Sequence, residues 1–341
     1  MPNDIVLFRV EELFARYNYA RDFFVSMGIA EIDTSLSLKE FVANIKHESL
    51  EDAGLNKEQL IENFMAFIDK MEALKSNSGN IVESISIIGG KDKYGNNEDI
   101  NLELKLGEVI SIVGPTGSGK SRLLADIECL AQKDTPTCRQ ILLDGKVPEA
   151  NRRFSMENKL VAQLSQNMNF VMDLAVEDFI KLHAESRMLD KQNEIVAAIV
   201  SCANDLAGEK FDRDTPLTQL SGGQSRALMI ADTALLSPSP IVLIDEIENA
   251  GIDRKKAVEL LLKEEKLVLI STHDPVLALM GDKRLVIKNG GISKIIVLSK
   301  EEKDYIDVLE EIDRKMLGIR SHLRSGGVLD DKIVDFELAR E

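Results

Sequence analysis

The segment Gly114–Ser121 combines glycines, a lysine and a serine at a spacing that suits phosphate binding. It fits the pattern G-x-x-x-x-G-K-[ST], in which glycines let backbone amides turn inward around phosphate oxygens. Lys120 would reach the β and γ phosphates of a nucleotide, and the hydroxyl of Ser121 would ligate Mg²⁺. A strand pattern before the segment and a helix pattern after it make a chance turn improbable. The predicted nucleotide contacts are Gly114, Pro115, Thr116, Gly117, Ser118, Gly119, Lys120, Ser121 and Arg122.

Two acidic side chains follow a second apolar run. Ile241–Ile244 has the composition of a buried strand, and Asp245 and Glu246 come directly after it. Asp245 can hold the Mg²⁺ shell, while Glu246 can face the γ phosphate and polarise the attacking water. The alternative, an acidic strand end that meets solvent, is much weaker in a chain that also carries a phosphate loop.

The stretch Leu220–Gln224, with the sequence Leu-Ser-Gly-Gly-Gln, lies between these two motifs. Many nucleotidases carry the phosphate loop and the strand ending in carboxylates, but the three together resemble the ATP-binding cassette (ABC) ATPases. The resemblance covers residues 82 to about 300. It implies an α/β fold of the P-loop NTPase class, with a mixed sheet core and a helical subdomain, and it implies that ATP and Mg²⁺ are bound and ATP is hydrolysed.

Two further segments carry the resemblance. Val161–Gln166 is similar to the segment that ends in the Q-loop glutamine, which makes Gln166 a better candidate than Gln163 for a catalytic and metal-binding glutamine. Ser271–Asp274 resembles the switch segment, which implies that His273 contacts the γ phosphate.

The resemblance also implies a head-to-tail homodimer. In such a dimer, the nucleotide held by the phosphate loop of one subunit is covered by the signature segment of the other. A glycine pair ahead of a helix offers backbone amides for this purpose. Hydrolysis would open the dimer, and this conformational change would do mechanical work. The residues assigned to this contact are Ser221, Gly222, Gly223 and Gln224.

Three places depart from the family pattern. Arg122 stands where threonine is usual, and Ile247 stands where transporter subunits mostly have proline. Isoleucine there is similar to soluble members involved in iron-sulfur assembly or chromosome maintenance. The segment Glu248–Asp253 is one residue longer than the common approach to the D-loop, in which Asp253 would fall.

Tyr94 is the only aromatic residue shortly before the phosphate-loop strand. Its ring could stack on adenine. It also lies in Lys91–Asn97, which has the composition of a turn, and an exposed aromatic on a surface turn is the equally weighted alternative.

The elements that must position these residues divide the chain. Residues 1–76 show helical spacing of apolar residues and hold nine of the sixteen Phe and Tyr residues, which predicts an N-terminal helical domain. Residues 77–81 form a polar linker. Residues 82–300 alternate strand-like and helical runs and predict the ATPase domain, with a helical subdomain at about 172–235 and a helical tail at 301–341.

Expected caps and strands lie at defined places in these domains. Ser37 with Glu40 and Asn56 with Gln59 have the spacing of capping boxes. Ile100–Glu108 is similar to the family's strand pair before the phosphate loop. The runs expected to be buried strands are Val109–Val113, Ile241–Ile244, Leu267–Ile270 and Leu285–Ile287.

The composition limits the cellular compartment and the classes of partner that are expected for the protein. The net charge of −16 argues against nucleic-acid binding as a primary role, so no direct nucleic-acid partner is expected. Three cysteines without metal-ligand spacing, and an N-terminus without a secretory pattern, favour a cytoplasmic protein, either free or peripheral to the inner face of the membrane.

The sequence leaves the output of the ATPase open. A soluble ATPase that remodels or assembles a partner is favoured by Ile247, the altered D-loop and the N-terminal helical domain. The alternative is the ATP-binding subunit of a transporter whose permease is a separate chain. It is favoured by the frequency of transporters in the family and by Met172–Asp178, which resembles the region where transporters dock a coupling helix.

In either case the partner protein would bind the N-terminal helical domain or the Q-loop surface. A module that only senses ATP ranks last because Glu246, Gln166 and His273 are all present.

Overall fold

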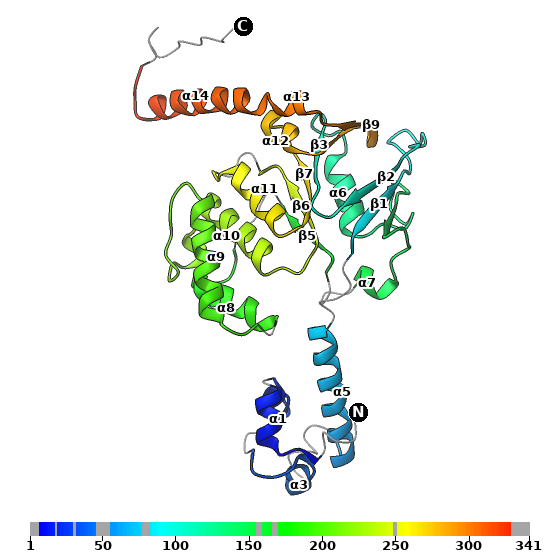
Figure 1. Ribbon diagram of the computed structural model, residues 1–341, viewed down its shortest axis with the longest axis vertical. Helices are drawn as coiled ribbons and strands as arrows, with labels where there is room; N and C mark the ends of the chain where they lie inside the picture. Colours follow the sequence, from blue (N-terminus) through cyan, green and yellow to red (C-terminus); the bar gives the residue numbers. More distant parts are fainter. Residues whose placement is uncertain are drawn as a thin grey trace. The chain divides into compact units, whose positions relative to one another are not determined.

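The computed structural model describes residues 7–17, 19–29, 32–45, 55–76, 82–154, 159–165, 170–187, 189–247 and 251–328. The chain separates into two compact units, Met1–Ile81 and Val82–Glu341, which are described one at a time (Figure 1). In the described ranges, no helix combines the length and the apolar composition that crossing a membrane requires.

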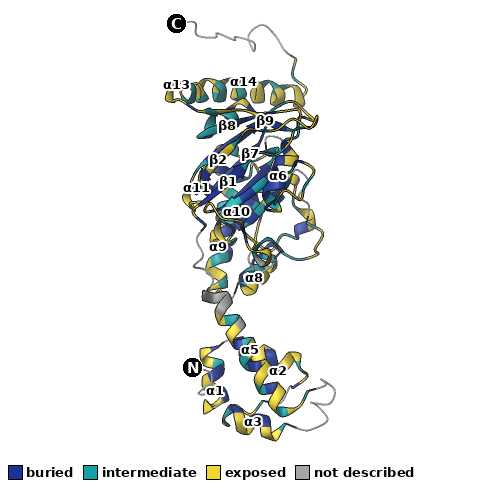
Figure 2. Cartoon of the chain, turned by 90° about the vertical axis from the view of Figure 1, so that its right-hand side faces the viewer, coloured by how far each residue is buried: buried dark blue, intermediate teal, exposed yellow. Residues whose placement is uncertain are grey.

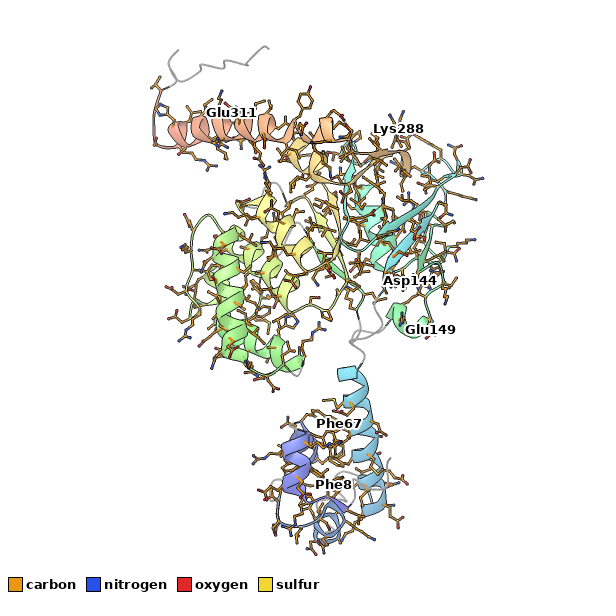
Figure 3. All side chains as sticks on the ribbon, viewed as in Figure 1. Phe8, Phe67, Asp144, Glu149, Lys288 and Glu311 are labelled. Atoms are coloured by element: carbon orange, nitrogen blue, oxygen red, sulfur yellow. The ribbon has the colours of Figure 1, made fainter. Side chains whose placement is uncertain are left out.

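The N-terminal unit consists of helices around an aromatic core. Helices α1 (Val10–Arg16), α2 (Ala20–Ser26) and α3 (Leu38–Asn44) accompany the longer α5 (Lys57–Ser76). Phe24 is fully buried between the rings of Phe41 and Phe64, at 5.3 and 4.9 Å. Phe67, labelled in Figure 3, lies on the side of α5 that meets the rings of Tyr19 and Phe23.

Both predicted capping boxes of this unit are confirmed. Ser37 accepts the backbone N–H of Glu40, and the Glu40 carboxylate accepts the N–H of Ser37, at the start of α3. Asn56 and Gln59 exchange the same two bonds before α5. Apolar residues recur at helical spacing from Val6 to Tyr17, but α1 ends at Arg16, and Val6 lies outside the described residues.

A six-stranded mixed sheet forms the centre of the second unit, with the strand order β5-β6-β7-β3-β8-β9. The first five strands are parallel and β9 is antiparallel to β8. The sequence pattern located β3, β6 and β7 correctly, since these central strands are almost continuously apolar, and the predicted run Leu285–Ile287 lies within β8. The strands are β5 (Val161–Leu164), β6 (Ile241–Asp245), β7 (Leu267–Ser271), β3 (Val109–Val113), β8 (Lys283–Lys288) and β9 (Gly291–Val297).

A separate three-stranded antiparallel sheet has the order β2-β1-β4. Its strands are β1 (Ser84–Ile88), β2 (Asn101–Lys105) and β4 (Gln140–Leu143). The predicted strand pair at Ile100–Glu108 therefore needs a correction. The two strands β2 and β3 follow one another, but β2 pairs with β1, and β3 belongs to the large sheet between β7 and β8.

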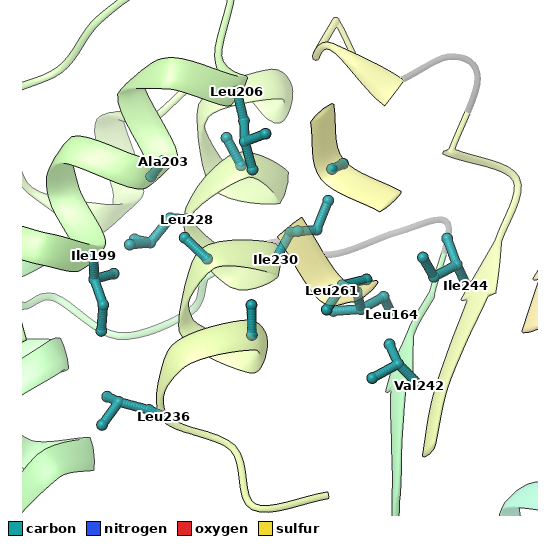
Figure 4. Close-up of a cluster of buried hydrophobic side chains, with 14 of the residues drawn as sticks. Leu164, Ile199, Ala203, Leu206, Leu228, Ile230, Leu236, Val242, Ile244 and Leu261 are labelled. Carbon is teal, nitrogen blue, oxygen red and sulfur yellow. The ribbon is translucent and has the colours of Figure 1, made fainter. Parts of the chain in front are cut away.

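Helices cover the large sheet through two apolar clusters. Alternate residues of a strand point to opposite faces, so Ile241 and Leu243 join one cluster with α6 while Val242 and Ile244 join the other. Figure 4 shows the second cluster, in which α10 lies between α9 and the strands. The helices are α6 (Lys120–Glu128), α7 (Ala150–Phe154), α8 (Val176–Ser186), α9 (Gln192–Leu206), α10 (Gly222–Leu235) and α11 (Arg254–Lys263), with a short 3₁₀ turn at Leu217–Gln219.

The chain continues through α12 (Pro275–Met280), α13 (Lys300–Lys303) and α14 (Ile306–Arg324). None of the side chains of α14 is buried, as Figure 2 shows by the absence of dark blue on this helix. Arg254, the first residue of α11, forms ion pairs with Asp274 at the start of α12 and with Asp313 of α14. These pairs connect the C-terminal helix to the segment that follows β7.

The predicted α/β fold, with a mixed sheet, a helical subdomain that carries the signature segment, and a preceding all-α segment, is confirmed by this arrangement.

Candidate active site

The candidate site lies where three neighbouring parallel strands end. Gly114 follows β3, Asp245 ends β6, and His273 comes two residues after β7, and these strands are adjacent in the order β6-β7-β3. The carboxyl ends of parallel strands meet at one edge of a sheet, which is where ligands of such folds bind. Residues 114, 245 and 273 are thereby brought to one place.

Two glycines of the phosphate-loop segment, Gly114 and Gly119, are required by close backbone contacts. A side-chain carbon at Gly114 would lie 2.5 Å from the carbonyl oxygen of Ile287, and one at Gly119 would lie 2.7 Å from Cα of Gly290. Gly119 also has a φ of 109°, which other residues rarely adopt. The segment therefore rests directly on the end of β8 and on the turn before β9, and α6 begins at Lys120.

Lys120 is buried, with only 5% of its surface exposed, and its amine is held in the loop. Its Nζ donates to the carbonyl oxygen of Gly114 at 3.0 Å and lies 2.9 Å from Nε2 of His273. A lysine amine that bonds to its own loop and to a neighbouring imidazole is positioned to exchange these contacts for phosphate oxygens.

Glu246 and His273 form the other side of the site. Oε1 of Glu246 lies 3.6 Å from Nε2 of His273. Glu246 has a φ of 51°, and its N–H donates to the carbonyl oxygen of Ser271. A left-handed conformation in a residue other than glycine is costly and occurs often at functional sites.

The residues present fit a phosphate and a divalent cation. Ser118 Oγ is buried and has no hydrogen-bond partner within the described part of the chain, so a buried polar group is left for a ligand. Ser121 Oγ donates to Asp245 Oδ2 at 3.4 Å. A hydroxyl beside a carboxylate supplies the hard oxygen ligands that Mg²⁺ prefers.

The signature segment forms the start of α10. Ser221 is exposed and caps the helix by accepting the N–H of Gln224, and the Gln224 side chain accepts the N–H of Ser221 at 2.8 Å. The Gln224 amide also donates to the carbonyl oxygens of Glu209 and Lys210. These bonds all stay within the helical subdomain, and Gly222 is exposed at the start of the helix, where the first N–H groups have no acceptor within the helix.

The other predicted site residues have different outcomes. Gln166 lies outside the described residues. Gln163 lies on β5, with its amide against the carboxylate of Glu128. Asp253 caps α11 by accepting the N–H of Lys256, and its own N–H donates to Leu206. Ile247 is buried in the apolar cluster beneath α10, which explains an aliphatic residue at this position.

Tyr94 lies on the turn between Lys91 and Asn97. Its side chain is 73% exposed, and Asp92 fixes the turn by accepting the N–H groups of Tyr94 and Asn96. The N–H of Lys93 donates to the carbonyl oxygen of Asn289, which ties this turn to the one between β8 and β9. Adenine stacking by Tyr94 stays a prediction.

Sequence reasoning missed a buried ionic group behind the loop. Arg139 is fully buried and bonds to both oxygens of Glu98. Burial alone would raise the pKa of Glu98, but the hydrogen bonds and charge of Arg139, together with the N–H groups of Ile292 and Gly90, hold this pKa below its usual value. The pair Asn289–Gly290 is a hairpin signal in the sequence, yet its contact with the phosphate loop has no local signature.

Comparison with known proteins identifies the class. A family profile described as ABC transporter matches residues 97–249. An ABC transporter ATP-binding protein of Methanocaldococcus jannaschii, MJ0121, is 52% identical over 246 residues, which cover 72% of this chain and 94% of the relative. The macrolide export ATP-binding/permease protein MacB of Campylobacter fetus is 29% identical over 232 residues, or 65% of this chain and 35% of MacB.

A solved structure agrees on the fold. The cbiO1 protein from Clostridium perfringens, part of the ABC transporter complex cbiONQ, superposes with a TM-score of 0.51 at 23% identity, covering 72% of this chain and all of that one. The chain therefore belongs to the ABC transporter ATP-binding protein family. It is an ABC-type ATPase that uses ATP with Mg²⁺, which confirms the predicted enzyme class and cofactors.

Proposed function

We propose that this chain hydrolyses MgATP between two copies of itself and uses the resulting opening to do conformational work on a partner protein. Lys120 and the amides of Gly114–Gly119 hold the phosphates, and Ser121, Asp245 and Gln166 hold the metal. Bound Mg²⁺ would neutralise charge on the phosphate oxygens. Glu246 accepts a proton from the attacking water, and His273 contacts the γ phosphate.

The observation that carries this proposal is the line of contacts from Lys120 to His273 to Glu246, at 2.9 and 3.6 Å. Glu246 and His273 follow the adjacent strands β6 and β7, and Lys120 begins α6 after the loop that follows β3. A phosphate-binding cation, an imidazole and a carboxylate in one place are the groups that phosphoryl transfer to water needs.

The hydrogen bonding of the signature segment within one chain supports the dimer. Among the described residues, Ser221 and Gln224 form hydrogen bonds only within the helical subdomain, and the 14-residue helix α10 begins at the exposed residues Ser221 and Gly222. The amides at a helix N-terminus attract anions. We assign Ser221, Gly222 and Gly223 to the ATP of the partner subunit, and Asp253 to the same interface.

For the output, we propose a soluble partner that is remodelled or assembled. The proposed domains are residues 1–76, the linker 77–81, the ATPase domain 82–300 and the tail 301–341. The first of these has its own aromatic core and carries exposed apolar side chains at Leu7 and Val25. A partner surface on this domain, in the cytoplasm, follows from the proposal.

The second candidate is a transporter subunit at the inner face of the membrane. It is supported by the relatives, which include a macrolide export ATP-binding/permease protein. It is also supported by Val171, which is 95% exposed, and by the exposed Met172. Met172 opens the segment Met172–Asp178, which resembles the region where transporters dock a coupling helix, and Val171 directly precedes it.

One experiment separates the two outputs. Full-length Glu246→Gln, loaded with MgATP, should retain its partner in a pull-down from the native cell, and Lys120→Ala serves as the matched control that cannot hold nucleotide. Recovery of a soluble protein only with Glu246→Gln supports remodelling. Recovery of an integral membrane permease would replace that proposal by transport.

A further inference from the structure

Arg139 lies behind the phosphate loop and binds four acceptors at once. Its Nε and Nη2 donate to the two carboxylate oxygens of Glu98, each at 2.8 Å, and Nη1 donates to Asp126 at 2.9 Å. Nη2 also donates to the carbonyl oxygen of Gly290 at 2.6 Å. Both carboxylates are almost completely buried with the guanidinium. Such a group holds its neighbours in one arrangement, because a lost bond leaves a buried charge unpaired.

The acceptors of Arg139 belong to three elements that surround the candidate site. Asp126 is on α6, the helix that begins with Lys120. Gly290 is in the turn between β8 and β9. Glu98 closes the turn that carries Tyr94, since its carboxylate accepts the N–H of Gly90 and its own N–H donates to the same residue's carbonyl.

The turn at Gly290 is in direct contact with the phosphate loop. The N–H of Gly290 donates to the carbonyl oxygen of Ser118 at 2.6 Å. Gly119 packs against Gly290 so closely that a side-chain carbon on Gly119 would lie 2.7 Å from Cα of Gly290. Any shift of Gly290 therefore moves Ser118 and Gly119, whose amides face the phosphates in the proposed site.

We propose that Arg139 is a positioning residue for nucleotide binding, which fixes the phosphate loop through Gly290 and the Tyr94 turn through Glu98. The inference rests on the proposed function. Arg139 does not contact the nucleotide. Glu246 and His273 follow strands β6 and β7, outside this network, so the network sets the affinity for MgATP and leaves turnover at saturating ATP almost unchanged.

The test is Arg139→Lys in the full-length protein. Lysine keeps the positive charge, but one ammonium group cannot span Glu98, Asp126 and Gly290 together. We expect the Kd and the KM for MgATP to rise about tenfold, from the loss of roughly one charge-assisted hydrogen bond at the loop. The kcat should stay within about twofold.

The matched control is Arg153→Lys. Arg153 also pairs with an aspartate, Asp134, and bonds to a backbone carbonyl, that of Cys129. Its replacement should leave the Kd for MgATP unchanged. Circular dichroism melting shows whether each variant is folded. If Arg139→Lys does not fold, the Kd and the KM for MgATP of Gly290→Ala test the inference instead. The added side-chain carbon would lie 3.3 Å from the backbone nitrogen of Lys93 and so would displace the turn at Gly290.

A folded Arg139→Lys protein with wild-type Kd, or one that loses kcat while keeping its KM, overturns the inference. Equal losses in Arg153→Lys would do the same. The proposed function fails separately, if Lys120→Ala binds MgATP as well as the wild type does.

Discussion

Glu246 is the side chain whose replacement should separate ATP binding from ATP hydrolysis. Glutamine keeps the size of the side chain but cannot accept a proton from water, so we expect kcat for Glu246→Gln to fall by about 10²–10⁴-fold. The Kd for MgATP should stay near the wild-type value. Phosphate release measures the first quantity and a nucleotide titration the second. Glu103→Gln on the exposed side of β2 is the control, and unchanged phosphate release in Glu246→Gln would remove the residue from its proposed role.

Lys120 acts before hydrolysis, in binding. Its buried amine donates to the loop carbonyl of Gly114, and removing it from the nucleotide complex loses charge-assisted bonds worth about 1.5–3 kcal/mol, or roughly 10- to 150-fold in Kd. Lys120→Ala should therefore weaken MgATP binding by that factor in a calorimetric titration. Lys105→Ala on β2 provides a lysine control. Normal affinity in Lys120→Ala would contradict the phosphate-loop assignment.

At the residue scale, the sequence identified the motifs whose residues are contiguous in the chain. Gly114–Ser121 and Asp245–Glu246 are contiguous patterns, so they could be found without a structure. The contact of Lys120 with His273 joins residues 153 positions apart, and only the family resemblance pointed to it. Arg139 had no signal, because its acceptors at 98, 126 and 290 meet only in the fold.

At the scale of elements, α10 must be held rigidly to present its signature segment. Leu228 of α10 is fully buried in the cluster shown in Figure 4. Leu228→Ala should lower the free energy of unfolding by about 2–5 kcal/mol, because it leaves a cavity in a packed cluster. Denaturant titration measures this change. Leu189→Ala, at an exposed leucine of the same subdomain, should cost about 0.5 kcal/mol or less, and equal losses would show that the cluster is not tightly packed.

Helices and strands could be predicted where their sequence pattern is strong and where the prediction does not depend on strand pairing. The apolar runs at β3, β6 and β7 and the capping boxes at α3 and α5 fixed those elements in advance. The separation of β2 from β3 into different sheets was not foreseen, because strand partners depend on contacts far along the chain. Likewise, nothing in the charged pattern of residues 301–324 indicated that Asp313 pairs with Arg254 beside the end of β7.

At the scale of the whole molecule, the proposed site is complete only in a dimer. The structure describes every residue of the phosphate loop and of the signature segment. Within one chain, no hydrogen bond joins these two segments. The signature of a second chain would supply the missing amides. ATP then acts as an intermolecular contact, and its hydrolysis removes the contact that keeps the dimer closed.

The mass of Glu246→Gln in solution, measured by light scattering after gel filtration with and without MgATP, tests this claim most directly. We predict the mass of one chain, 37.9 kDa, without nucleotide and about twice that mass with MgATP. Ser221→Arg added to the same variant should abolish the doubling, because it blocks the contact across the interface. A protein that binds MgATP and keeps the mass of a single chain would contradict the account.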